Sequence, residues 1–534
     1  HYERERHVSD EFTDGEITLN VSGRMDGFDS SAWLVEEIKT TRATPEQAER
    51  YLGSSHWAQL TLYAALLARE FPQQSSWQLQ LTYCHPDDCS EFPLQKVAGQ
   101  HELEEYLRQT IETYLSWQHQ QLAYRKQRDH WLAELDFPFP RFRAHQQSLA
   151  RRVYQAFRDK ERLLLEAPTG SGKTLGVLFP AVKALAEDHC NRLFYLTSRS
   201  TGTRAVASAL ALLNNPARQL RSIELIAREK ACAVPGTPCR SDRCDYARGY
   251  YDRRSGAVTE LLERAVMDAA TVAEVAQIHT VCPFELSLDA ALWADVIIGD
   301  YNYILDPVVR LQRFAGDSQL GLLIDESHQL TDRGRDMLSL ELQRRQITAA
   351  LGEPLADGLA KRLRSLDAAL LKLRREQLAS EERRIDAPEV VLRAISKTLQ
   401  ALAEENVELE SLPNTQELVF NLSRWQRSDD WINEEDFAFF GSSPEASRGQ
   451  RHNVQLRLAC LDPGPYLARV LDEFGAHVRF SGTLTPLPLY QKLHGYPQAP
   501  AERVASGFSP SQLGLFIITD VSVLYRDRTR SLST

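Results

Sequence analysis

A glycine-rich stretch, EAPTGSGKT at residues 166–174, constrains the fold of this chain more than any other feature of its sequence. The apolar run LLL precedes it and LGVLFPAVKAL follows it, so we expect it to connect a buried strand to a helix. A glycine-rich loop in that position wraps its backbone N–H groups around the phosphates of a nucleotide. The sequence therefore predicts an α/β domain with a phosphate-binding loop at the edge of a parallel sheet.

Five residues of this loop are expected to bind the nucleotide or its magnesium. Lys173 is expected to reach the β and γ oxygens of ATP, and Thr174 is expected to ligate magnesium. The small residues that we expect to bring the backbone close to the phosphates are Gly170, Ser171 and Gly172.

A second motif, LLIDESH at residues 322–328, is an apolar strand that ends in two carboxylates. We expect Asp325 to hold magnesium through water, and Glu326 to orient and deprotonate the attacking water. Either motif alone could arise by chance. The two together, in this order and each at the end of a strand, predict ATP hydrolysis.

Length, charge and cysteine content set wider bounds. A chain of 534 residues is too long for one core, so we expect two to four domains. The formal net charge of −11 does not indicate a nucleic-acid-binding protein, although a locally basic channel is compatible with an acidic exterior. No apolar run reaches membrane-spanning length. Eight cysteines are too few for a disulfide scaffold and indicate a reducing compartment, where a cluster of them would bind metal.

Hydrophobic patterning divides the chain into blocks. In the first block we expect strands near residues 16–22, 33–39 and 77–84, a helix near 55–70 and a long polar helix over 101–134. The stretch DFPFPRF then marks a linker, because its prolines cannot continue a helix. Beyond it, apolar runs such as RLFYLTS and DVIIGD alternate with helices, which is typical of a parallel sheet. Two insertions interrupt this alternation, the first at about 228–284 and the second, expected to be helical, at about 331–450. The basic residues of the second insertion could follow a DNA backbone or form a solvated helix face.

From about residue 140 the chain resembles the XPD/DinG family of superfamily 2 DNA helicases. The stretches that carry the resemblance are RAHQ, APTGSGKT, YLTSRSTGT, ADVIIGDYNYILDP, DESH and FSGTLTP, in family order. Ala167 stands where the loop consensus has its first glycine, a departure that such helicases commonly show. The resemblance places Arg143 and Gln146 on the adenine side of the nucleotide and implies ATP-driven 5′-to-3′ movement on single-stranded DNA.

Four cysteines in the first insertion suggest a metal site, because the residues between them are polar and loop-like. Spacing alone does not choose between zinc and a 4Fe–4S cluster. The resemblance favours the cluster, because the family places four cluster ligands here and the last is followed by proline. The expected ligands are Cys232, Cys239, Cys244 and Cys282.

One stretch of the first block, GRMDGFDSSAWLVEEIKTT, is expected to form two half-buried strands. Residues two apart in a strand project to the same side, so Glu37 and Lys39 share a face, and they could be a simple ion pair. With Asp26 on the preceding strand, they have the spacing of a PD-(D/E)xK nuclease core. There Asp26, Glu37 and the carbonyl of Ile38 would bind Mg²⁺ or Mn²⁺, and Lys39 would activate water or stabilise the charge on phosphate.

The following helix, HWAQLTLYAALL, adds Gln59 and Tyr63, which are four apart and share a face. They could be an ordinary amphipathic pair. Together with GRMDGF and VEEIKT, however, QLTLY resembles the RecB-type nuclease family, whose glutamine and tyrosine contact DNA beside the metals. The family also has a metal-binding His or Glu upstream of the first strand. His7 lies in a strand-like stretch and fits poorly, so we expect that residue outside this sequence, which does not begin with methionine.

The predicted architecture is multidomain α/β, with a restriction-endonuclease-like domain and a RecA-like motor domain that carries a cysteine domain and a helical arch. A second motor domain, with its arginine finger, is expected to begin near the end and to continue beyond this sequence. The expected divisions are a nuclease domain at 1–134, a linker at 135–142, motor domain 1 at 143–227, 285–330 and 451–500, an iron–sulfur domain at 228–284, an arch at 331–450 and the start of motor domain 2 at 501–534.

The sequence thus predicts a monomeric ATP-dependent DNA helicase–nuclease that acts on single-stranded or flapped DNA. We expect it in the bacterial cytoplasm, with no membrane contact and with a single-strand-binding protein as a candidate partner. The main alternative is a DNA-binding helicase or translocase whose N-terminal domain is inactive and only holds the substrate. An RNA-directed enzyme is a more distant alternative, since recognition of a 2′-OH leaves no clear mark in a sequence.

Overall fold

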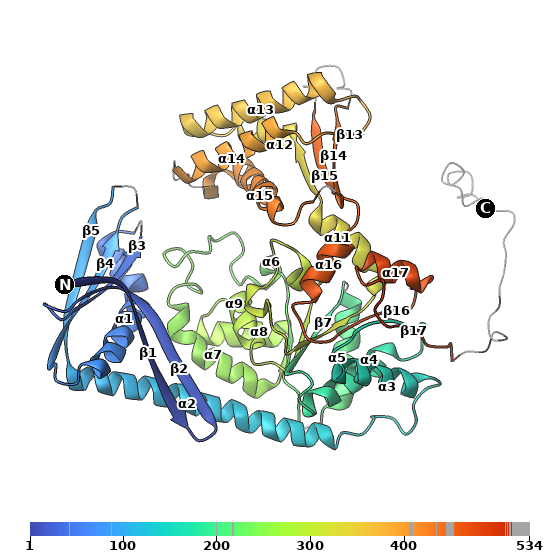
Figure 1. Cartoon of the computed structure of the whole chain (residues 1–534), viewed down its shortest axis with the longest axis horizontal. Helices are drawn as coiled ribbons and strands as arrows, with labels where there is room; N and C mark the ends of the chain where they lie inside the picture. Colours follow the sequence, from blue (N-terminus) through green and yellow to red (C-terminus); the bar gives the residue numbers. More distant parts are fainter. Residues whose placement is uncertain are drawn as a thin grey trace.

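The computed structural model describes residues 1–41, 43–86, 88–198, 200–215, 218–404, 409–433, 435–444, 453–507, 509, 511 and 514. These residues form three β-sheets with helices packed on them (Figure 1). The predicted multidomain α/β architecture is confirmed. No helix among the described residues is long and apolar enough to cross a membrane.

The N-terminal part is a five-stranded mixed sheet. Its elements are β1 (Tyr2–Asp14), β2 (Ile17–Asp29), β3 (Leu34–Thr40), α1 (Pro45–Glu70), β4 (Ser76–Cys84), β5 (Glu91–Gly99) and α2 (Gln100–Ala133). The strand order is β1-β2-β3-β4-β5, with β3 and β4 parallel and the other neighbours antiparallel. Helix α1 makes the crossover that the parallel pair requires.

Helix α1 begins about ten residues before the start that the apolar periodicity predicts. The reason is a capping box: the side chain of Thr44 accepts a hydrogen bond from the backbone N–H of Gln47, whose side chain accepts one from the N–H of Thr44. Buried side chains of α1 and of one sheet face, such as Leu60 and Val35, form the core of this part. Because strand side chains alternate, Glu37 lies on the same face as Val35 and therefore under α1.

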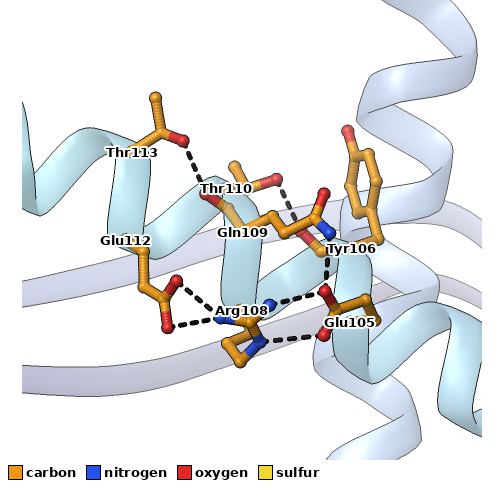
Figure 2. Close-up of polar contacts among 7 residues, drawn as sticks. All are labelled: Glu105, Tyr106, Arg108, Gln109, Thr110, Glu112 and Thr113. Carbon is orange, nitrogen blue, oxygen red and sulfur yellow. Dashed lines mark hydrogen bonds and ion pairs between the residues drawn. The ribbon is translucent and has the colours of Figure 1, made fainter.

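Helix α2 runs from the N-terminal sheet to the large central sheet (Figure 1). Its exposed side is polar: Arg108 lies 2.5 Å from Glu105 and 2.6 Å from Glu112. Figure 2 shows the guanidinium between the two carboxylates. The hydrogen bonds from Arg108 lower the pKa of Glu105 to about 2. These exposed (i, i+3) and (i, i+4) pairs keep charged side chains of α2 in solvent and contribute only slightly to the stability of the helix.

The second half of α2 is buried against the central sheet. Nη1 of Arg128 donates to Oδ1 of Asp295 over 2.6 Å, and both side chains are almost fully buried. The ring of Trp117 packs edge-on against Trp293, with 5.3 Å between ring centroids. Nζ of Lys183 donates to the carbonyl of Ala133, so the last turn of α2 is also held. The joint between α2 and the central sheet is thus a buried ion pair with further hydrogen bonds and an aromatic contact, which together fix α2 on the sheet.

The central sheet has eight strands, all parallel, in the order β17-β6-β16-β11-β7-β10-β8-β9, as predicted from the short apolar runs. Its strands are β6 (Arg162–Glu166), β7 (Arg192–Leu196), β8 (Ser222–Glu224), β9 (Val266–Met267), β10 (Val296–Gly299), β11 (Leu320–Ile324), β16 (His477–Ser481) and β17 (Ala501–Arg503). Its helices are α3 (Gln146–Arg158), α4 (Lys173–Ala186), α5 (Ser200–Leu213), α10 (Asn302–Leu305), α16 (Gly464–Leu471) and α17 (Leu487–Leu493).

Strand β17 lies where we expected a second motor domain to begin. It pairs with β6 instead, so residues 501–503 are an edge strand of the first sheet. Most of the remaining predicted stretch, including all of 515–534, lies outside the described residues.

The cysteine-bearing insertion is mostly helical, and its strand β9 pairs with β8 at the edge of the central sheet. Its helices are α6 (Arg228–Ala231), α7 (Tyr250–Arg264), α8 (Ala269–His279) and α9 (Pro283–Ala291). The N-terminal part touches this insertion, because the hydroxyl of Ser54 on α1 donates to Asp252 on α7 at 3.2 Å.

The sequence predicted a helical second insertion, and this was wrong in part. The insertion also contains a four-stranded antiparallel sheet. Its elements are α11 (Leu330–Leu338), β12 (Leu340–Gln343), α12 (Arg344–Ala350), α13 (Asp357–Gln377), β13 (Arg383–Ile385), α14 (Glu389–Glu404), α15 (Pro413–Arg427), β14 (Phe437–Ser442) and β15 (Gln455–Cys460). Strand β15 lies beyond the predicted boundary at 450 and pairs with β12 and β14. Glu353 caps α15 by accepting hydrogen bonds from the backbone N–H groups of Asn414 and Thr415.

Candidate functional site

The glycine-rich loop connects β6 to α4, as predicted. Gly170 and Gly172 have φ of 82° and 75°, which only glycine adopts without strain, and α4 begins at Lys173. The ammonium of Lys173 lies close to Gly482, after β16: a Cβ added to Gly482 would be 3.1 Å from Nζ. The loop opens on a cavity of about 750 Å³, large enough for a nucleotide.

Arg143 and Gln146 hold this loop from its other side. Nη1 of Arg143 donates to the carbonyl of Gly170 over 2.8 Å, and Nε2 of Gln146 donates to that of Gly172 over 3.1 Å. Both side chains also line the cavity, next to Phe139 of the linker. They therefore shape the loop directly, and their predicted contacts with adenine stay a prediction.

The carboxylates of the second motif face the same end of the sheet. Asp325 directly follows β11. Burial raises the pKa of Asp325, although a hydrogen bond from Tyr195 and the charge of Lys173 oppose this rise. Glu326 has a left-handed backbone, with φ of 48°, and its side chain accepts a hydrogen bond from Ser481 over 3.1 Å. The loop and both carboxylates thus meet at the carboxyl edge of a parallel sheet, where α/β folds bind ligands.

The sequence reasoning missed two tyrosines that hold Asp325. Oη of Tyr195 on β7 donates to Oδ2 of Asp325 over 2.9 Å, and the hydroxyl of Tyr301 donates to the main-chain carbonyl of Asp325. The other carboxylate oxygen, Oδ1, accepts from the N–H of Glu326 over 2.8 Å. Tyr195 is the first residue of the motif YLTSRSTGT, so the sequence predicted its strand. The sequence did not predict its hydrogen bond to Asp325.

The predicted strand pair of the N-terminal part brings Asp26, Glu37 and Lys39 together. Nζ of Lys39 donates to Oε1 of Glu37 over 2.6 Å, and Oδ2 of Asp26 accepts from the backbone N–H of Ile38 over 2.6 Å. Glu37 is only 3% exposed, while Ile38 points to the open face of the sheet. The shared face of Glu37 and Lys39 is as the strand alternation predicted.

Glu37 has one oxygen without a partner. Its Oε2 is buried and has no hydrogen bond within the described residues, whereas a buried carboxylate normally satisfies both oxygens. Burial raises the pKa of Glu37, the hydrogen bond from Lys39 opposes this, and the charge of Asp26 adds to it. Two carboxylates, one with a bare buried oxygen, fit the donor set of a hard divalent cation. Across the described part of the chain, however, no three His, Cys, Asp or Glu side chains are placed to hold one metal ion.

Gln59 and Tyr63 lie together on α1, the helix that packs on this sheet. Nε2 of Gln59 donates to the hydroxyl of Tyr63 over 2.9 Å, and the ring of Tyr63 lies directly on Gly23, where a Cβ would come within 2.3 Å of it. A pair that we did not predict lies one turn earlier: Nδ1 of His56 is 2.9 Å from the hydroxyl of Tyr83. Burial and the charge of Lys39 lower the pKa of His56, so the ring of His56 lies near Lys39.

The four predicted cluster cysteines are free thiols in one insertion. Cys232 ends α6, Cys282 precedes α9, Cys239 is exposed and Cys244 is buried. Burial raises the pKa of Cys282 and the charge of Cys239 adds to it, so these two thiols lie near each other. Nη2 of Arg253 donates to the carbonyls of residues 245, 248 and 280, which ties the chain around Cys244 to the chain before Cys282. The donor chemistry fits a cluster, but the four thiols do not form one compact group.

A groove of about 1050 Å³ lies between the cysteine-bearing insertion, the central sheet and α15. Cations, aromatic rings and several carboxylates line it. Its lining includes Arg228, Lys230, Phe284, Tyr303, Arg310, Arg313 and Phe420, and the acidic Glu224, Glu229, Glu285 and Asp300.

Comparisons with known families agree with the two halves of this description. The model of the PD-(D/E)XK nuclease superfamily matches residues 1–162, and the DEAD_2 model matches residues 207–347. The chain carries a PD-(D/E)XK nuclease-superfamily domain followed by a DEAD_2 helicase domain. The nuclease-superfamily match contains Asp26, Glu37 and Lys39, and the DEAD_2 match contains the cysteine-bearing insertion and the motif at 322–328.

Curated helicases resemble part of the chain. Regulator of telomere elongation helicase 1 of Homo sapiens is 22% identical over 267 residues, which are 41% of this chain and 22% of that protein. Its homolog in Anopheles gambiae is 22% identical over 271 residues, or 41% of this chain and 27% of that protein. A probable ATP-dependent helicase of Methanocaldococcus jannaschii is 46% identical over 46 residues, 9% of this chain and 7% of that protein. The chain thus spans about a quarter or less of the length of these relatives.

Solved structures of XPD proteins also resemble the chain. An XPD helicase matches with a TM-score of 0.46 and 16% identity, covering 68% of this chain and 62% of that one. A truncated XPD matches with a TM-score of 0.45 and 17% identity, covering 67% of this chain and 99% of that one.

Proposed function

We propose that this chain is an ATP-driven DNA helicase–nuclease. Its DEAD_2 region would move 5′ to 3′ along single-stranded DNA, and its N-terminal domain would hydrolyse phosphodiester bonds in single-stranded or flapped DNA. The observation that carries the proposal is the bare, buried Oε2 of Glu37 beside Asp26. A buried acceptor without a partner costs free energy, so a simple Glu37–Lys39 ion pair does not account for it, whereas a divalent cation does.

At the first site, Asp26, Glu37 and the main-chain carbonyl of Ile38 would hold Mg²⁺ or Mn²⁺. When bound, such an ion polarises the phosphate and lowers the pKa of a bound water. The ammonium of Lys39, kept in place by Glu37, would stabilise the charge that develops on the phosphate.

Helix α1 would contribute contacts to the DNA itself. The amide of Gln59 and the ring of Tyr63, which are hydrogen-bonded to each other, would contact the strand.

At the second site, the loop and the carboxylates would bind and hydrolyse ATP. Lys173 would neutralise the β- and γ-phosphates, and Thr174 and Asp325 would hold magnesium, which supplies charge stabilisation for phosphoryl transfer. Glu326 would orient the attacking water and accept its proton. The cavity beside the loop and the convergence of these residues at one sheet edge support this assignment.

The groove between the cysteine-bearing insertion and α15 supports a path for single-stranded DNA. Its cations could follow the phosphates, and rings such as Phe284 and Phe420 could stack on bases. Residues 228–284 and 331–450 would then act as the iron–sulfur and arch domains that frame this path. The four thiols would hold a 4Fe–4S cluster once the chain at 232–244 closes on Cys282. Iron and sulfide analysis of anaerobically purified protein tests this, with Cys282→Ser expected to lose both.

A second candidate function is a helicase whose N-terminal domain only holds DNA. The lack of any group of three acidic, His or Cys side chains around Glu37, in the described chain, favours it. In that case no manganese-dependent cleavage would appear at any protein concentration.

Crossed variants of the two sites separate the proposals. We expect Lys173→Ala to lose DNA-stimulated ATPase and keep nuclease activity, and Lys39→Ala to do the reverse. Phosphate release and cleavage of a labelled single strand are the two measurements. Loss of both activities in either variant would contradict two independent sites.

A further inference from the structure

One buried hydroxyl holds the carboxylate that we expect to bind magnesium through water. Tyr195 lies in the middle of the central sheet, with its side chain fully buried. Its Oη donates to Oδ2 of Asp325 over 2.9 Å. The side chain of Thr174, at the start of α4, lies close to the same hydroxyl. Tyr195 is therefore placed beside both the phosphate loop and the carboxylate motif.

The direction of this hydrogen bond follows from its chemistry. An ionised carboxylate only accepts, so Tyr195 must donate its single proton to Asp325. The phenolic oxygen is then left only as an acceptor.

The carboxylate of Asp325 is constrained at both oxygens. Its Oδ2 accepts from Tyr195, and its Oδ1 accepts from the N–H of Glu326. This carboxylate is thus fixed in orientation before a cation arrives.

We propose that Tyr195 is a positioning residue for magnesium at the nucleotide site; this rests on the proposed ATPase function of that site. Partners of this kind, which orient metal ligands without touching the metal, change metal affinity by about 10- to 100-fold when they are removed. Nothing in the spacing of the sequence motifs pointed to this role, because Tyr195 is 130 residues from Asp325.

Tyr195→Phe tests the proposal, since it removes one oxygen from a buried ring and keeps its shape. Binding of a fluorescent ATP analogue to the full-length natural protein is measured in EDTA and over a series of Mg²⁺ concentrations. We expect binding in EDTA to be unchanged and the half-saturating Mg²⁺ concentration to rise about 10-fold.

Two further variants separate positioning from packing. Tyr250→Phe removes a matched hydrogen bond, because its hydroxyl donates to Oδ2 of Asp289 over the same 2.9 Å, away from the site. It should leave the Mg²⁺ dependence at the wild-type value. Tyr301→Phe removes the bond to the main-chain carbonyl of Asp325 and should shift it less than Tyr195→Phe does.

Three results would overturn the proposal. The first is a wild-type Mg²⁺ dependence in Tyr195→Phe. The second is an equal loss of binding with and without Mg²⁺ in that variant, which would show a merely structural role. The third is a wild-type protein that binds no nucleotide at all, which would also refute the proposed ATPase, whereas the first two leave that function intact.

Discussion

Replacing Asp295 by asparagine should loosen the joint between α2 and the central sheet. The carboxylate of Asp295 is 2% exposed and accepts hydrogen bonds from three donors of two different segments. The donors are Nη1 of Arg128 at 2.6 Å, the hydroxyl of Tyr124, and the backbone N–H of Arg221 at 2.8 Å. Asparagine keeps the shape but loses the charge, and its NH₂ group faces donors rather than acceptors.

The expected cost follows from the burial of Arg128. Removing one charge of a buried ion pair destabilises a protein by roughly 3–5 kcal/mol, because the other charge stays buried. Arg128 retains a second partner, since its guanidinium is 2.7 Å from the partly exposed Asp129. We therefore expect the lower end, about 3 kcal/mol, which corresponds to an increase of roughly 100-fold in the opening of the joint.

Hydrogen exchange in the second half of α2 measures this opening. The Asp295→Asn variant should exchange faster over residues 117–133, while exchange in α1 should be unchanged. Arg108→Ala is the matched control: it removes an exposed ion pair on the same helix and should leave the exchange of α2 as in the wild type. Equal exchange in Asp295→Asn and wild type would refute the idea that this ion pair fixes the helix.

Three other substitutions test local geometry. Gly482→Ala places a Cβ 3.1 Å from Nζ of Lys173 and should lower the ATPase rate by about 10-fold or more, with folding unchanged by circular dichroism. Gly23→Ala would collide with the ring of Tyr63 at 2.3 Å and should weaken DNA cleavage without lowering ATPase; equal cleavage would exclude a role for that ring position. Hydrogen bonds at the start of α15 outweigh partial burial and lower the pKa of Glu353, so its stabilising effect is present above about pH 4.3 and is lost as the pH falls. The melting temperature of Glu353→Gln should therefore be below the wild type at neutral pH and converge with it in acid, and a constant difference would contradict this.

Residues that are close in the sequence were the ones whose arrangement could be predicted. The glycine-rich loop, the strand before Asp325 and the alternation of Glu37 and Lys39 all depend on local backbone geometry, and each lies as expected. The early start of α1 was also encoded locally, in the capping residues Thr44 and Gln47, but apolar periodicity does not register a capping box.

Contacts between distant segments could not be predicted from patterns. His56 meets Tyr83, and Tyr195 meets Asp325, only because separate strands and helices are brought together by the sheet order. The pairing of β15 with β12 likewise joins segments that lie more than a hundred residues apart, which is why the boundary at 450 did not coincide with the end of the second insertion.

Cleavage of end-labelled single strands tests the account most directly. The full-length natural protein and its Lys39→Ala variant are incubated with manganese, with and without ATP, and with DNA labelled at the 5′ or the 3′ end. The account predicts cleavage by the wild type that is absent from Lys39→Ala, and the label that shortens first gives the polarity. No cleavage by either protein, with ATPase intact, would contradict it and leave Glu37 and Lys39 as an ion pair in a DNA-holding domain.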